Sequence, residues 1–148
     1  MLKKGQKAPA FTAPDQSGKI VSLEDYAGKK LVLYFYPQDN TPTCTDEACN
    51  LRDNYKALMK QGYHILGVSP DYPKKHTNFI KKYGLPFSLL ADEDLKLSKA
   101  YNVWALKTLF GREYMGVLRT TFIIDEQGEI EKVISKVKSK EHSSQILD

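Results

Sequence analysis

Short apolar runs alternate with longer segments of helical periodicity along much of the chain. Residues 31–36 form a continuous apolar run that ends at Pro37, which is typical of a strand buried on both faces. Residues 42–61 carry apolar positions at helical spacing, and Gly62 ends the predicted helix. The next apolar run, over residues 63–69, predicts a second strand.

The later segments continue this pattern. Pro73 begins a predicted helix that ends at Gly84, a strand follows over residues 87–91, and a helix follows over residues 95–101. Residues 120–125 and 129–135 are rich in β-branched side chains and flank a turn at Gly128, so they predict a β-hairpin. A short leading strand over residues 19–23 and a last helix starting near Lys140 complete the prediction.

Strand–helix–strand repetition implies right-handed crossovers and a mainly parallel central sheet with helices on both faces. The predicted terminal hairpin adds antiparallel pairing, so we expect an α/β fold with a central mixed β-sheet. The sequence contains no internal repeat, low-complexity tract or Gly/Ser linker, and we therefore expect a single domain over residues 1–148.

Composition narrows the function classes. The chain has 148 residues with 41% hydrophobic and 27% charged positions, which is typical of a globular protein and excludes disordered and coiled-coil classes. The net charge of +4 is spread along the chain and predicts no nucleic-acid partner. No apolar stretch approaches the length of a membrane span, and no apolar run follows the charged start. We therefore expect a cytoplasmic protein.

In a reducing compartment, two cysteines are more often catalytic or metal-binding than structural. Thr41 is a suitable N-cap and Pro42 a suitable first residue for the predicted helix, which places Cys44 in the first helical turn. Backbone N–H groups and the helix dipole favour an anion there, so this thiol should lose its proton more easily than a free one. The nearby carboxylates of Asp46 and Glu47 oppose this effect, and a cation from elsewhere in the chain would offset them.

The second cysteine and the three histidines can also be explained by structural roles. Cys49 could be a buried helix thiol beside Ala48. Zinc binding would need two more ligands, and the spacing of His64, His76 and His142 does not cluster with the cysteines. His64 and His76 are expected to be packing or surface residues. His142 follows several lysines and is expected to be solvated.

The sequence resembles a known family over its whole length. The motif Pro37-x-x-x-Thr41-x-x-Cys44 is similar to the active-site signature of peroxiredoxins, and Cys49 five residues later resembles the PrxQ, or bacterioferritin comigratory protein, branch. Three further motifs fall in the expected order, namely Gly5-x-x-Ala8-Pro9-x-Phe11, Leu85-Pro86-Phe87 and the segment from Arg119 to Asp125. Thr43 departs from this branch, because many members have glycine there, so its effect on pocket access stays open.

The resemblance implies a thioredoxin-like fold and a thiol-dependent peroxidase without a metal or organic cofactor. It implies that Cys44 is the peroxidatic nucleophile and that Cys49 resolves its sulfenic acid as an intramolecular disulfide. Thr41 would hydrogen-bond the peroxide and the thiolate, and Pro37 would shield the pocket from water. Arg119 would supply the cation, stabilising the thiolate and polarising the peroxide.

The implied partners are a hydroperoxide and a dithiol reductant such as thioredoxin, acting on a monomer. Two other functions would use the same thiols. A thiol–disulfide oxidoreductase of this fold would carry Cys-x-x-Cys, whereas this chain has Cys-x-x-x-x-Cys. A redox-sensing protein would oxidise without turnover.

Overall fold

A five-stranded sheet organises the computed structural model, which describes residues 2–148. The strand order places the predicted strands side by side, as β5 (Ser88–Ala91), β4 (Tyr63–Ser69), β3 (Lys30–Phe35), β8 (Thr120–Ile124) and β9 (Ile130–Ile134). Strands β3, β4 and β5 are parallel, whereas β8 pairs antiparallel with both β3 and β9. The mixed sheet and the terminal hairpin are thus confirmed.

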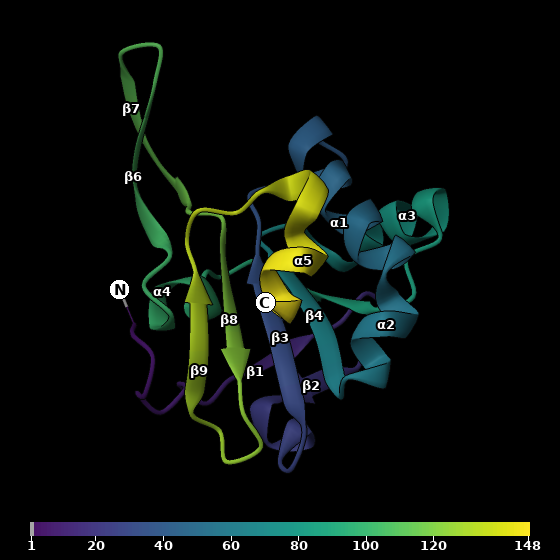
Figure 1. Cartoon of the computed structure of the whole chain (residues 1–148). Helices are drawn as coiled ribbons and strands as arrows, with labels where there is room; N and C mark the ends of the chain where they lie inside the picture. The colour runs from purple at the N-terminus through teal and green to yellow at the C-terminus, as the bar shows by residue number, and fades with distance from the viewer. Residues whose placement is uncertain (1) are drawn as a thin grey trace.

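Helices cover both faces of the sheet. One face carries α1 (Pro42–Asp53), α2 (Tyr55–Lys60), α3 (Pro73–Tyr83) and the C-terminal α5 (His142–Leu147), as Figure 1 shows. The opposite face carries α4 (Lys96–Ala100) and the two-stranded sheet of β1 (Thr12–Pro14) and β2 (Ile20–Ser22). Short 3-10 turns precede β3 and α5, as η1 (Leu23–Tyr26) and η2 (Ser139–Glu141).

The sheet separates two hydrophobic cores because alternate side chains of β3 point to opposite faces. Leu31, Leu33 and Phe35 pack under α4 and the N-terminal strands, whereas Val32 and Tyr34 pack under the larger helical layer. Cys44 belongs to this second core. The nucleophile predicted from the sequence therefore sits against the sheet rather than on the outer surface of its helix.

Two parts of the sequence-based prediction need correction. The helix expected over residues 42–61 is broken at Asn54, whose backbone and side-chain N–H groups both donate to the Asn50 carbonyl, at 3.2 and 2.9 Å. The hairpin β6 (Trp104–Leu109) and β7 (Arg112–Val117) was not predicted. Figure 1 shows this hairpin extending away from the body, and Phe110 at its turn is 95% exposed.

Within residues 2–148, no helix combines the length and the apolar character that crossing a membrane requires.

Candidate active site

The site forms where β3 leads into α1. Thr41 occupies the N-cap position with extended backbone angles, and its carbonyl accepts the first helical hydrogen bond from Thr45 N–H at 2.8 Å. Its side chain does not cap the helix; the hydroxyl donates to the Gln38 carbonyl at 3.1 Å. Cys44 is the third residue of the helix, so it lies in the first turn as predicted, and it is 2% exposed.

Arg119 reaches this turn from the start of β8. The antiparallel register pairs Thr120 with Phe35, which places the preceding Arg119 beside the carboxyl end of β3. Its Nη2 donates to Cys44 Sγ at 3.2 Å and its Nη1 donates to Glu47 Oε1 at 2.7 Å. One planar guanidinium therefore holds the sulfur and a carboxylate together, a geometry that a lysine ammonium cannot reproduce.

Glu47 is a buried partner that the sequence analysis treated only as an opposing charge. It follows Cys44 by three residues, so both side chains lie on one helix face. Burial raises the pKa of Glu47, the attraction and hydrogen bond of Arg119 lower it, and the net pKa is about 7. For Arg119, burial lowers the pKa, but Glu47 and Cys44 together raise it above its usual value. The guanidinium is therefore charged and is shared by two acidic groups.

His142 of α5 extends the cluster, contrary to the expectation that it is solvated. Its side chain is fully buried, with Nε2 at 2.7 Å from Thr121 Oγ1 and 3.5 Å from Glu47 Oε2. Burial lowers its pKa, which favours the neutral imidazole. The prediction failed because the C-terminal helix packs against α1, a tertiary contact that the local lysine-rich pattern does not reveal.

A second cation lies close to this cluster. Lys107 of β6 donates from Nζ to the Val117 carbonyl at 3.0 Å. Burial lowers the pKa of Lys107, and Arg119 lowers it further, whereas Cys44 raises it. The unpredicted hairpin thus contributes positive charge at the site.

The remaining predicted site residues are positioned by the same loop and helix. Pro37 and Thr41 bound the loop between β3 and α1, and both are partly exposed. Among the described hydrogen bonds, none joins the Thr41 hydroxyl to the thiol. Cys49 lies further along α1, partly exposed and free, and burial raises its pKa while Arg52 opposes the rise. Thr43, the second residue of α1, is exposed.

Residues 4–133 match the AhpC/TSA family. The chain belongs to this family. It is 49% identical over 143 residues to peroxiredoxin Bcp of Bacillus subtilis, covering 97% of this chain and 91% of that protein. It is 48% identical over 146 residues to a putative peroxiredoxin bcp of Coxiella burnetii, covering 99% and 97%.

Solved structures agree with the sequence relatives. A crystal structure of Xylella fastidiosa PrxQ matches with a TM-score of 0.92 and 30% identity, covering 99% of this chain and 94% of that one. A structure of Xanthomonas campestris bacterioferritin comigratory protein matches with a TM-score of 0.90 and 34% identity, covering 98% and 95%. The thioredoxin-like α/β fold is thereby confirmed. This peroxiredoxin is of the Bcp/PrxQ type and is a thiol-dependent peroxidase.

Proposed function

We propose that Cys44 is the peroxidatic residue of this enzyme and reduces hydrogen peroxide and small organic hydroperoxides. The observation that carries the proposal is the 3.2 Å hydrogen bond from Arg119 to the Cys44 sulfur in the first turn of α1. The guanidinium and the helix N-terminus both favour the thiolate, which is the nucleophilic form.

The chemical step needs no other redox group. The thiolate attacks the terminal peroxide oxygen, an S–O bond forms, the O–O bond breaks, and the departing alkoxide or hydroxide takes up a proton. Arg119 stabilises the negative charge that moves from sulfur onto the leaving oxygen. The Thr41 hydroxyl, which donates to the Gln38 carbonyl, keeps its oxygen lone pairs available to the bound hydroperoxide, and Pro37 excludes water at the start of the loop.

Cys49 completes the proposed cycle as the resolving residue. Its sulfur attacks the Cys44 sulfenic acid, which releases water and forms an intramolecular disulfide. A dithiol reductant such as thioredoxin then returns both thiols by exchange. Because both cysteines belong to one chain, this cycle needs no second subunit and is compatible with a cytoplasmic monomer.

Disulfide formation requires α1 to open. Cys44 and Cys49 both lie within the continuous helix α1. Five residues of α-helix separate Cα atoms by about 8.6 Å and rotate the side chains by about 140°. A disulfide needs Cα atoms within roughly 7 Å and converging Cβ vectors. The helix must therefore unwind between the two cysteines after oxidation.

The test is peroxide consumption coupled to thioredoxin and its reductase, for the wild type and for Cys44→Ser and Cys49→Ser. We expect turnover only in the wild type, with Cys49→Ser consuming one equivalent and accumulating a sulfenic acid. Non-reducing peptide mapping should find a Cys44–Cys49 bond in monomeric protein. Retained turnover in Cys44→Ser would contradict the assignment. Insulin reduction without peroxide loss would favour a thiol–disulfide oxidoreductase, and oxidation without turnover would favour a redox sensor.

A further inference from the structure

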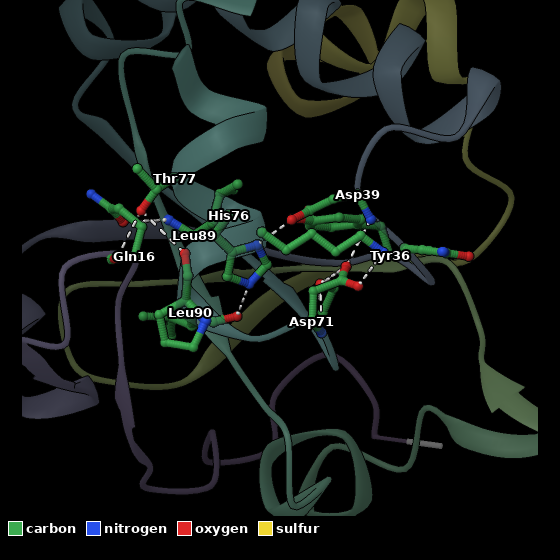
Figure 2. A network of polar contacts seen from close by, with 12 residues as sticks. Gln16, Tyr36, Asp39, Asp71, His76, Thr77, Leu89 and Leu90 are labelled. Carbon is green, nitrogen blue, oxygen red and sulfur yellow. Dashed lines mark hydrogen bonds and ion pairs between the residues drawn. The ribbon is translucent and has the colours of Figure 1, made fainter. Parts of the chain in front are cut away.

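A second buried polar cluster lies on the other side of the loop that connects β3 to α1. Figure 2 shows the His76 ring of α3 between Asp39 of this loop and the backbone of Leu90 in β5. His76 Nδ1 lies 2.7 Å from Asp39 Oδ2, and both side chains are fully buried. The sequence pattern predicts a packing or surface position for His76 and no role for Asp39.

Every polar side-chain atom of His76 and Asp39 has a hydrogen-bond partner. His76 Nε2 is 2.9 Å from the Leu90 carbonyl, which can only accept, so Nε2 must carry a proton. One more proton then lies between Nδ1 and the Asp39 carboxyl. The other carboxyl oxygen accepts from the Tyr36 hydroxyl at 2.6 Å, and burial raises the pKa of Tyr36 well above its usual value, so this hydroxyl stays a donor. The pair is neutral overall and fully satisfied.

The loop backbone is held by the same neighbouring elements. Asp39 N–H donates to Asp71 Oδ2 at 2.7 Å, and the Asp71 carboxylate also accepts from the Ser69 hydroxyl. Asn40, whose φ of 62° is in the left-handed region, accepts from the Tyr83 hydroxyl at 3.1 Å. Residues from the end of β4 through α3 therefore restrain both Asp39 and Asn40.

Asp39, Asp71 and His76 also bring three potential metal-ligand atoms within 4.8 Å of one another. These potential ligand atoms already make hydrogen bonds within the protein. Asp39 Oδ2 lies against His76 Nδ1, and Asp71 Oδ2 accepts two hydrogen bonds. A cation would have to break these contacts. The geometry favours a structural clamp over a metal site.

We propose that the Asp39–His76 pair positions the loop over residues 37–41 for the reaction of Cys44 with peroxide. This inference rests on the proposed function, because Pro37 and Thr41 at the two ends of the loop are the residues that would shape the peroxide pocket. This clamp, the Asp39–His76 pair, is held by α3, β5 and the segment between β4 and α3, and none of its partners belongs to α1. It therefore stays in place when α1 unwinds, and its loss should slow the peroxide step without slowing disulfide formation.

The test compares variants that break or keep the hydrogen bonds. Asp39→Ala and His76→Leu each leave a buried polar partner unpaired and should slow sulfenic acid formation by about 10- to 100-fold, the range expected for small misplacements of reacting groups. Asp39→Asn can accept from Tyr36 and donate to His76 Nδ1, so it should keep most of the rate. His64→Gln, a partly buried histidine in β4 outside the clamp, should react like the wild type.

The peroxide step is measured in the Cys49→Ser background by trapping the sulfenic acid. The disulfide step is measured after a stoichiometric peroxide pulse in proteins that retain Cys49. If Asp39→Ala and His76→Leu both fold and both react with peroxide at the wild-type rate, the inference is overturned. An Asp39→Asn rate as low as that of Asp39→Ala, or an equal slowing of both steps, would also overturn it. The proposed function fails separately, if Cys44→Ser still turns over peroxide.

A measurement on the unsubstituted protein covers the case in which His76→Leu does not fold. The Nε2–H proton of His76, buried and bonded to Leu90, should exchange with water far more slowly than the ring N–H of His64 in NMR spectra. Equal exchange of the two rings would overturn the inference.

Discussion

Replacing Arg119 by alanine should destabilise the native state in a pH-dependent way, because it removes the cation that holds the buried Glu47. Glu47 Oε1 lies 2.7 Å from Arg119 Nη1, and the Glu47 side chain is fully buried. Burial raises the pKa of Glu47 and Arg119 lowers it, and the net pKa in the native protein is about 7. Without Arg119, the folded-state pKa of Glu47 should therefore rise further.

The magnitude follows from proton linkage. The unfolded chain titrates Glu47 in the same way in both proteins, so only the native-state pKa determines the difference. Below pH 6 the carboxyl is protonated in both native states, and its contribution to the difference is small. Above pH 7 it ionises in the wild-type native state but not in the variant, and the difference grows towards about 1.4 kcal/mol per pH unit. We therefore expect Arg119→Ala to lose about 1 kcal/mol more at pH 8 than at pH 6.

Urea unfolding at pH 5, 6, 7 and 8 measures this difference. The Cys44→Ser background removes the thiol that Arg119 also contacts. In Glu47→Gln protein, the loss on Arg119→Ala should no longer grow between pH 7 and 8; variation at pH 5 and 6 would come from His142, whose pKa Arg119 also lowers. As a matched control, Lys30→Ala removes a more exposed pair with Glu131 at 3.4 Å and should cost less than about 1 kcal/mol.

A loss that is constant from pH 5 to 8, or one that varies equally with and without Glu47, would refute the coupling between Arg119 and Glu47. Activity provides a second comparison in protein that retains Cys44. Arg119→Lys restores the charge, but one ammonium cannot donate to Cys44 and Glu47 in the same fork geometry. It should therefore recover the stability more fully than the rate with peroxide.

Two further predictions test the helix and the sheet beneath it. Oxidised protein should lose amide-exchange protection over residues 43–52 and melt at a lower temperature than reduced protein, and equal protection in both redox states would contradict the unwinding of α1. Gly67→Ala should destabilise the protein by about 1–3 kcal/mol in urea unfolding, because a Cβ there would lie 2.6 Å from Leu89 Cδ2 and 2.9 Å from Tyr34 Cζ. Gly116→Ala, whose nearest neighbour is the flexible Lys107 side chain at 3.0 Å, should cost less, and an equal loss would contradict the close-packing argument.

The predictable parts of the fold have strong local signals. Pro42 and Pro73 occupy the first positions of α1 and α3, and Gly84 ends α3 with φ of 61°. The run over residues 31–36, most of which forms β3, is apolar at every position, so its assignment did not depend on partners. The hairpin of β6 and β7 lacked such a signal, because it stands away from the body and exposes apolar side chains such as Leu106 and Phe110.

The site was predictable only in part for a related reason. Cys44 at a helix N-terminus is a local feature, and the need for a cation followed from the neighbouring carboxylates. Glu47 could have been assigned to the same face as Cys44 from its spacing of three residues. The contact of Arg119 with both groups depends on the register of β8 against β3, and the burial of His142 depends on how α5 packs. Neither arrangement is encoded in a local pattern.

In the proposed cycle, the intact helix α1 holds Cys44 in place for the reaction with peroxide and also keeps it apart from Cys49. Next to Cys49, the Asn50 side chain donates to the Lys140 carbonyl at 2.9 Å and accepts from Ser143 N–H at 2.8 Å. These bonds connect the middle of α1 to the C-terminal segment. If α1 unwinds through Cys49, either these bonds break or the C-terminal segment moves together with Asn50. The closed helix keeps the Cys44 sulfur beside Arg119, where we propose that it reacts with peroxide. In the proposed cycle, oxidation converts Cys44 into a sulfenic acid, which alters the hydrogen bond that Arg119 donates to the reduced sulfur. We therefore expect oxidation to weaken a contact that holds the first turn of α1 closed, which favours the opening that the proposed disulfide requires.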